Sequence, residues 1–117
     1  MVTKVVEANF DPSVTAAISG GPAISNVIHT DSNYDALANT ILSTSGGYIK
    51  VTGTGFSNSP QLFISSNSSY TLATSISFIN STEIRSELPA TSAGDYNVYV
   101  FNPNGTFAIK VNGVTFA

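Results

Sequence analysis

Short apolar runs that alternate with polar residues extend along most of the chain, and Gly, Pro, Asn or Ser interrupts them every few residues. This alternation is typical of β-strands, because successive side chains of a strand point to opposite sides of the sheet. Helical periodicity is almost absent, and only Tyr34–Ala38 is compatible with a helical turn. The pattern therefore predicts an all-β fold.

The alternating runs predict eight short strands, which is enough for two packed antiparallel sheets. The expected strands are Ala23–His29, Gly47–Gly53, Gln61–Ser65, Ser69–Ala73, Ser75–Asn80, Glu83–Leu88, Tyr96–Asn102 and Thr106–Phe116, the last with a break at Asn112–Gly113. Asp11–Pro12 and the sequence Gly20–Gly21–Pro22 at the junction with the domain interrupt any strand in residues 1–21. We therefore expect an extended N-terminal arm over residues 1–21 and one domain over residues 22–117.

The arm has two interpretations. It is either a disordered terminus or extra edge strand of its own domain, or a segment that orders on a neighbouring subunit. In the second interpretation Val5, Val6 and Phe10 are the apolar anchors. These three residues are therefore candidate partner-binding residues.

The alternation also assigns faces to the strand Tyr96–Asn102. Its residues Tyr96, Val98 and Val100 are expected in the core, so that Tyr99 and Phe101 face outward. Phe63 has the same outward parity on a strand expected in the same sheet. The three outward aromatic residues predict a partner-binding surface, because exposed apolar patches mark interfaces. The alternative is that the arm or the segment Ile28–Ser45 covers this face.

The strand Glu83–Leu88 concentrates charge. Ile84 and Leu88 are expected to turn inward around Ser86, whereas Glu83, Arg85 and Glu87 form a charged outer face. The simplest interpretation is a solvated strand or an edge strand whose charges guard against aggregation.

Charge is otherwise scarce, since charged residues make up 9% of the 117 residues and the net charge is −3. The 41 Ser, Thr and Asn residues replace charge with neutral polar groups. The few Lys and Arg residues are scattered, so the sequence does not favour nucleic acid as a partner. A membrane is not expected either, because no run approaches the roughly 20 apolar residues of a transmembrane helix and the first residues do not resemble a signal peptide.

The stretch Gly46–Phe56, GGYIKVTGTGF, places a Gly-Gly turn before a strand that ends in Gly-x-Gly-Phe. It resembles the signature of the IPT/TIG family, and the resemblance covers about residues 22–117. It implies an immunoglobulin-like β-sandwich of two antiparallel sheets. Glycines allow positive φ at the turn and the corner, Ile49 and Val51 are expected to face inward, and Phe56 is expected to close the core.

The resemblance departs from the family pattern in one place, because the insert Ile28–Ser45 separates Pro22–Val27 from the Gly-Gly turn. Family domains occur in transcription factors, cell-surface receptors, carbohydrate-active enzymes and virus particles, mostly as modules without catalytic activity. The resemblance therefore implies the fold more specifically than it implies the function.

The sequence offers no convincing catalytic, cofactor or metal site. His29 has no nucleophile at a suggestive spacing, and a local hydrogen bond is its expected role. Asp31–Asp35 imitates half of a calcium loop, but Ala36 and Leu42 stand where an EF-hand needs Gly and an acidic ligand, so a capped turn is expected. The sequons at Asn67, Asn80 and Asn104 are expected by chance in a chain so rich in Asn, Ser and Thr. We expect no enzyme activity.

These features favour a structural protein of a virus particle, most simply a bacteriophage capsid decoration or tail accessory protein. Its expected location is the virion, and its expected partners are capsid or tail subunits or further copies of itself. The alternative is a carbohydrate-binding or adhesive module of a bacterial surface protein, located outside the cell or on its surface. Tyr34, Tyr70, Asn102 and Asn104 are the residues that suggest it.

Overall fold

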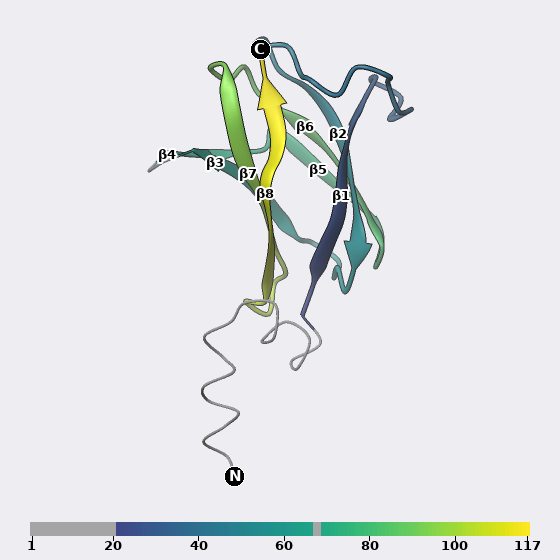
Figure 1. The fold of residues 1–117 in the computed structure, drawn as a ribbon. Coiled ribbons are helices and arrows are strands. Elements are labelled where there is room, and N and C mark those ends of the chain that lie inside the picture. The colour runs from purple at the N-terminus through teal and green to yellow at the C-terminus, as the bar shows by residue number, and fades with distance from the viewer. Residues whose placement is uncertain (1–20, 67–68) are drawn as a thin grey trace.

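The computed structural model describes residues 21–66 and 69–117, which form a sandwich of two antiparallel four-stranded sheets (Figure 1). The first sheet has the strand order β1-β2-β6-β5, and the second has the order β4-β3-β7-β8. The strands are β1 (Ala23–Thr30), β2 (Gly47–Thr54), β3 (Gln61–Ser66), β4 (Ser69–Leu72), β5 (Ser75–Asn80), β6 (Glu83–Leu88), β7 (Gly94–Phe101) and β8 (Phe107–Phe116).

The two sheets enclose one core, because the alternating side chains of each sheet turn their apolar members inward. Ile49 and Val51 of β2 are fully buried, as the sequence predicts, and Phe56 closes one end of the core at 3% exposure. The buried apolar cluster comprises Leu42, Ile49, Val51, Phe56, Leu62, Ile64, Ile84, Leu88, Val98, Val100, Val114 and Phe116. Both sheets contribute to this cluster, and Leu42 adds to it from the connection between β1 and β2.

Glycine is required at two positions of the Gly46–Phe56 stretch. Gly46 has a φ of 106°, and a Cβ there would clash with the carbonyl oxygen of Leu88. At Gly53 a Cβ would clash with the carbonyl oxygen of Ala23, so glycine lets β1 approach β2 closely. The motif therefore follows from backbone geometry and close packing.

The eight strands lie where the alternation predicts them, with differences at some ends. The expected break at Asn112–Gly113 is wrong, because β8 continues through these residues as a bulge. The register of β7 and β8 shifts there, and Asn112 takes a positive φ of 52°. Two extra residues of β8 are accommodated inside the strand, so Val114 and Phe116 still reach the core.

Tyr34–Ala38, the stretch whose sequence is compatible with a helical turn, does not form one. Tyr34 takes a positive φ of 64°, and the backbone amide of Asp31 donates to the carbonyl oxygen of Asp35. The carboxylate of Asp31 accepts hydrogen bonds from the amides of Asn33 and Asp35. These bonds close a turn instead of a helix, as short acidic side chains commonly do.

The interpretation of Glu83–Leu88 as an edge strand is wrong, although its faces are assigned correctly. β6 lies between β2 and β5 inside the first sheet, and Ile84, Ser86 and Leu88 are fully buried. The charged side chains of β6 are half-buried on the outer side of this sheet. The edges of the first sheet are β1 and β5, so the charges have another role than protecting an edge.

A tyrosine and an asparagine tie the ends of β7 to neighbouring loops. The Tyr96 hydroxyl donates to the carbonyl oxygen of Ser92, 2.9 Å away and four residues upstream. Asn102, which is 5% exposed, donates from its amide to the carbonyl oxygen of Gly55 and accepts from the amide of Ser57. The second contact links the β2–β3 connection to the end of β7.

Candidate partner-binding face

Six apolar side chains gather on the outer side of the second sheet, and we call this set the aromatic face. Its members come from all four strands of the sheet: Phe63, Tyr70, Leu72, Tyr99, Phe101 and Phe107. The antiparallel register places Phe63 opposite both Leu72 and Tyr99, and Phe101 opposite Phe107. Strand alternation directs these residues outward because Leu62, Ile64, Val98 and Val100 of the same strands turn into the core.

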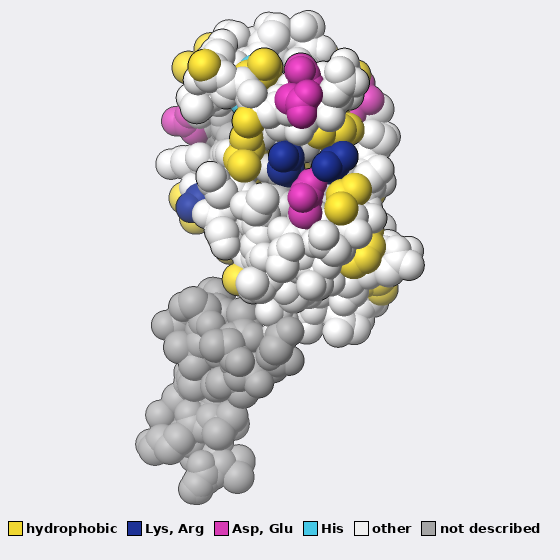
Figure 2. Space-filling view, turned by 90° about the vertical axis from the view of Figure 1, so that its right-hand side faces the viewer, with side chains coloured by type: hydrophobic (Ala, Val, Ile, Leu, Met, Phe, Trp, Pro, Cys, Tyr) yellow, Lys and Arg dark blue, Asp and Glu magenta, His cyan; other side chains and the backbone are white. Residues whose placement is uncertain are grey.

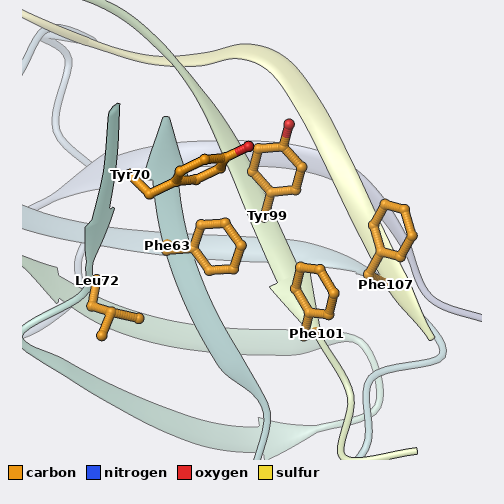
Figure 3. Close-up of a pocket in the computed structure, with 6 residues that line it drawn as sticks. All are labelled: Phe63, Tyr70, Leu72, Tyr99, Phe101 and Phe107. Carbon is orange, nitrogen blue, oxygen red and sulfur yellow. The ribbon is translucent and has the colours of Figure 1, made fainter. Parts of the chain in front are cut away.

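The rings form a continuous series of contacts across the sheet (Figure 3). Phe63 is stacked with Tyr99 at a centroid distance of 5.0 Å and with Phe101 at 5.4 Å. Phe101 is stacked in turn with Phe107 at 5.0 Å. Tyr70 contacts Phe63 edge to face at 5.5 Å. Contacts of this kind hold the rings in one arrangement, so the surface is preorganised for binding.

The aromatic face encloses a shallow hollow of about 450 Å³. Leu72 is 67% exposed, Tyr70 66% and Phe107 43%. None of the described residues that line the hollow is charged. An apolar surface this exposed is typical of an interaction site, because contact with water is unfavourable for it.

The outer side of the first sheet has the opposite character, as Figure 2 shows. Lys50 and Arg85 lie opposite each other on β2 and β6, and Arg85 Nε donates to Glu83 Oε2 at 2.7 Å. The guanidinium of Arg85 also lies over the ring of Tyr34, 5.6 Å from its centroid. Burial raises the pKa of the Tyr34 hydroxyl, and the nearby carboxylate of Glu87 raises it further.

The connection between β1 and β2 contacts this charged side through Tyr34 and the edge of β8 through Leu42, and none of its residues lines the aromatic face. Its Tyr34 packs edge to face on Tyr48 of β2, with 5.7 Å between the ring centroids. The alternative that the segment Ile28–Ser45 covers the aromatic residues is therefore wrong. Its first residues, Ile28–Thr30, belong to β1.

The structure brings together the three candidate residues of the described domain, Phe63, Tyr99 and Phe101, as the alternation predicts. The other three candidates, Val5, Val6 and Phe10, lie outside the described residues. Sequence reasoning missed Leu72 and Phe107 and considered Tyr70 only for sugar binding. Their signal was the same alternation in β4 and β8, but recognising it required the register between strands.

The residues that suggest sugar binding do not form a common site. Tyr34 packs on Tyr48 of the first sheet, whereas Tyr70 lies on β4 of the second sheet, and Asn102 is buried with its amide already hydrogen-bonded. Asn104 is exposed in the turn between β7 and β8. These positions leave the aromatic face as the candidate binding surface of the described domain.

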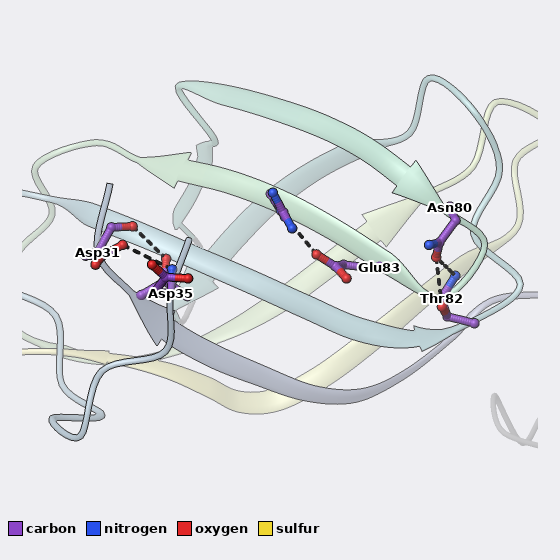
Figure 4. Close-up of polar contacts among 7 residues, drawn as sticks. Asp31, Asp35, Asn80, Thr82 and Glu83 are labelled. Atoms are coloured by element: carbon purple, nitrogen blue, oxygen red, sulfur yellow. Dashed lines mark hydrogen bonds and ion pairs between the residues drawn. The ribbon is translucent and has the colours of Figure 1, made fainter. Parts of the chain in front are cut away.

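The remaining polar motifs serve local structure (Figure 4). The side-chain oxygen of Asn80 accepts from the amide and hydroxyl of Thr82, and Asn104 does the same with Thr106. Two sequons thus form turns, whereas Asn67 lies outside the described residues. The ring of His29 is hydrogen-bonded through Nδ1 to the carbonyl oxygen of Asn39 at 2.6 Å, the local role that the sequence predicts.

The described part of the chain, residues 21–66 and 69–117, holds no group of three or more His, Cys, Asp or Glu side chains close enough to bind one metal ion. It also contains no helix with the length and hydrophobicity needed to cross a bilayer.

Strand order and local geometry define the class of protein. The order β1-β2-β6-β5 facing β4-β3-β7-β8 corresponds to strands A-B-E-D facing C-F-G of the immunoglobulin fold, with one strand added beside C. The bond from Tyr96 to Ser92, near the start of the strand equivalent to F, is the tyrosine corner of that fold. The protein is thus an immunoglobulin-like β-sandwich.

Comparison with protein families identifies the kind of immunoglobulin-like domain. Residues 35–117 match the family model of the IPT/TIG domain, and the chain belongs to this family. The match begins in the connection after β1, so β1 lies outside it. β1 nevertheless pairs with β2 in the same sheet. A search among curated proteins finds no match. Domains of this family generally act in protein–protein or adhesive interactions and are typically non-enzymatic.

Proposed function

We propose that the chain is a structural protein of a virus particle, a bacteriophage capsid decoration or tail accessory protein, that acts in the virion. It binds other capsid or tail subunits, or further copies of itself, through the aromatic face. The observation that carries this proposal is the continuous, uncharged series of half-buried rings across the second sheet, flanked by the exposed side chains of Tyr70, Leu72 and Phe107. The polar motifs of the described domain, by contrast, are engaged in turns and local bonds.

The composition of the chain supports a role in an assembly of many copies. A net charge of −3 on 117 residues gives little long-range repulsion between neighbouring copies. On a repetitive lattice, several weak contacts made together produce strong attachment. A small, rigid apolar face is sufficient for such attachment, because each copy needs to supply only part of the total affinity.

An adhesive module of a bacterial surface protein is the alternative, located outside the cell or on its surface. It would use the same face, since Tyr34, Tyr70, Asn102 and Asn104 do not converge. The rings of the aromatic face are largely stacked on one another, so their flat sides are less available to sugars than to apolar protein segments. This geometry favours a protein partner.

Quantitative mass spectrometry of purified virus particles tests the proposal. The chain should remain with intact particles at a fixed number of copies per particle. The double variant Tyr99→Ser/Phe101→Ser should lower that number at least tenfold while its circular dichroism stays that of a β-sandwich. A second pair, Leu72→Ser/Phe107→Ser, changes the most exposed rim of the face if the first pair fails to fold.

The matched control is Ile79→Ser on β5 of the other sheet, because Ile79 is 42% exposed and Phe107 is 43% exposed. The control variant should keep the wild-type copy number. Absence of the wild-type chain from particles, or equal loss in the control, would refute the proposed function. Retention on the surface of bacterial cells would support the adhesive alternative instead.

A further inference from the structure

We propose that the aromatic face of one copy binds the N-terminal arm of a neighbouring copy, with Phe10 and Val6 as the anchors. The inference rests on the proposed function in one respect, namely that the aromatic face is an interaction surface. It adds the identity of the segment that the face receives. Copies would then join head to tail, arm to face.

The size of the face argues against a second copy of the whole domain as its occupant. Strands lie about 4.8 Å apart and outward residues recur about every 6.8 Å along a strand, so the members of the aromatic face cover a patch on the order of 200 Å². A stable protein–protein interface buries about 800 Å² on each partner. The hollow of about 450 Å³ has room for a few side chains and not for an opposing sheet. A single peptide segment suits this surface better.

The arm has the composition that such a surface selects. Ten of its first twenty residues are apolar, and the surface that would receive them is lined by uncharged side chains. Val6, Ala8 and Phe10 alternate with Glu7 and Asn9, so a bound strand would have one apolar and one polar side. The apolar side would contact the rings, and Glu7 would stay in water without the cost of burying a charge.

The place where the arm joins the domain favours a neighbouring copy as the receiver. Gly21 leads into β1 of the first sheet, and its carbonyl oxygen lies against Gly55 at the corner after β2. The aromatic face is the outer side of the other sheet. Phe10 precedes Gly21 by eleven residues, a reach of up to about 36 Å, so it can extend to another molecule. Arm and face on different surfaces produce a heterologous contact, which repeats from copy to copy.

Complementation between two variants of the full-length chain tests this contact. Phe10→Ser removes the arm anchor and leaves the face intact, whereas Phe107→Ser weakens the face and leaves the arm intact. In sedimentation velocity, wild-type protein should form oligomers whose size increases with concentration. Each variant alone should associate at least tenfold more weakly, because one half of every contact is lost. Their equimolar mixture should form a 1:1 heterodimer and nothing larger.

Matched controls accompany each variant. Val14→Ser lies in the same arm outside the anchors, and Ile79→Ser lies on the other sheet; both should associate like wild type. Leu72→Ser replaces Phe107→Ser if the latter does not fold. Wild-type protein that stays monomeric would overturn the inference. If Phe107→Ser loses association and Phe10→Ser keeps it, the copies pair face to face, and this result would also overturn the inference. Failure of the mixture to form a heterodimer would also overturn it.

Binding of the arm to its own domain is a further outcome that overturns the inference. The chain has no cysteine, so Asn9→Cys provides a unique attachment site for a spin label. Spin-labelled protein mixed with isotope-labelled wild type, which carries no spin label, should broaden the resonances of Leu72 and Phe107 in the isotope-labelled copy. Broadening that appears only when the isotope-labelled molecule itself carries the spin label would show an intramolecular contact. If the wild-type chain stays on particles but does not associate with itself, this inference is refuted and the proposed function stands. If the chain associates with itself but does not stay on particles, the proposed function is refuted.

Discussion

The outer sides of the two sheets are built by the same strand alternation and yet have opposite surfaces. On the first sheet, Lys50, Glu83 and Arg85 form a charged cluster against which Tyr34 packs from the chain's own β1–β2 connection. On the second sheet the corresponding positions carry stacked, half-buried rings, and Tyr70, Leu72 and Phe107 beside them are exposed. The first surface is thus satisfied within the molecule, whereas the second still has apolar area to bury.

This difference shows where binding energy remains available. Partly exposed ion pairs contribute little to stability, because water and salt compete with them. Exposed rings held in place by their neighbours lose little side-chain entropy when a partner covers them. The second sheet is therefore the better binding surface, although the first carries the more conspicuous sequence pattern.

The largest expected effect comes from giving the aromatic face a charge. Leu72→Lys/Phe107→Lys should weaken partner binding by roughly 100-fold, because a bound segment would have to bury ammonium groups in an apolar contact. Binding to purified particles, measured as copies retained at increasing dilution, checks this expectation. The control Ile79→Lys adds the same charge to the first sheet and should bind like wild type; equal weakening there would show that the two surfaces do not differ in function.

A second change tests how strongly the rings support one another. Phe63→Ala removes the ring that contacts Tyr70, Tyr99 and Phe101, so the free energy of unfolding should fall by about 2 kcal/mol. Urea denaturation measures this change. A loss below about 0.5 kcal/mol would mean that the stacked arrangement contributes nothing to the stability of the fold.

A substitution in the charged surface of the first sheet should lower the free energy of unfolding by less than Phe63→Ala does. Arg85→Ala removes the ion pair with Glu83 and the contact with Tyr34, and it should lower the free energy of unfolding by about 0.5–1 kcal/mol. The loss should shrink in 1 M NaCl, which screens ion pairs. Lys50→Ala is the matched control, and it should cost less because Lys50 lies opposite another cation. A loss larger than that of Phe63→Ala would reverse the comparison between the two surfaces.

The smallest expected effect appears at alkaline pH. The folded chain raises the pKa of Tyr34 above its ordinary value of 10.0, first by burial and then by the carboxylate of Glu87. The unfolded chain therefore loses this proton at lower pH, and stability present below pH 10 falls as the pH rises through the folded pKa. Urea midpoints between pH 9 and 11 should fall more steeply in wild type than in Tyr34→Phe. Identical slopes would contradict the expected burial of the hydroxyl.

The alternation of apolar and polar residues was sufficient to predict the strands and their faces. It separated Val98 and Val100 from Tyr99 and Phe101 correctly, because the two-residue period of a strand is a local property. The Gly46–Phe56 stretch also predicted correctly that Ile49, Val51 and Phe56 lie in the core. Its glycines are required by close backbone contacts.

What the sequence did not predict depends on contacts between distant segments. The central position of β6 was missed because its charges resemble those of an edge strand, although Ile84 and Leu88 pack in the middle of the core. The extent of the aromatic face was missed because Leu72 and Phe107 join it only through the register of β4 and β8. Leu42 belongs to the core through bonds with Thr115 and Ala117 that no local pattern indicates.

The bonds from Leu42 to Thr115 and Ala117 join segments that are far apart in the sequence, and such distant contacts affect how the chain folds. β1 and β8 lie side by side (Figure 1), and Phe116 near the end of β8 is buried at 1% exposure. Sandwiches rich in such distant pairings fold in milliseconds to seconds, because long loops must close before their contacts form. During synthesis the core cannot be completed until β8 has left the ribosome. Until then the strands that will carry the rings are available to other nascent chains, so the copy number of the protein in the cell affects how reliably it folds.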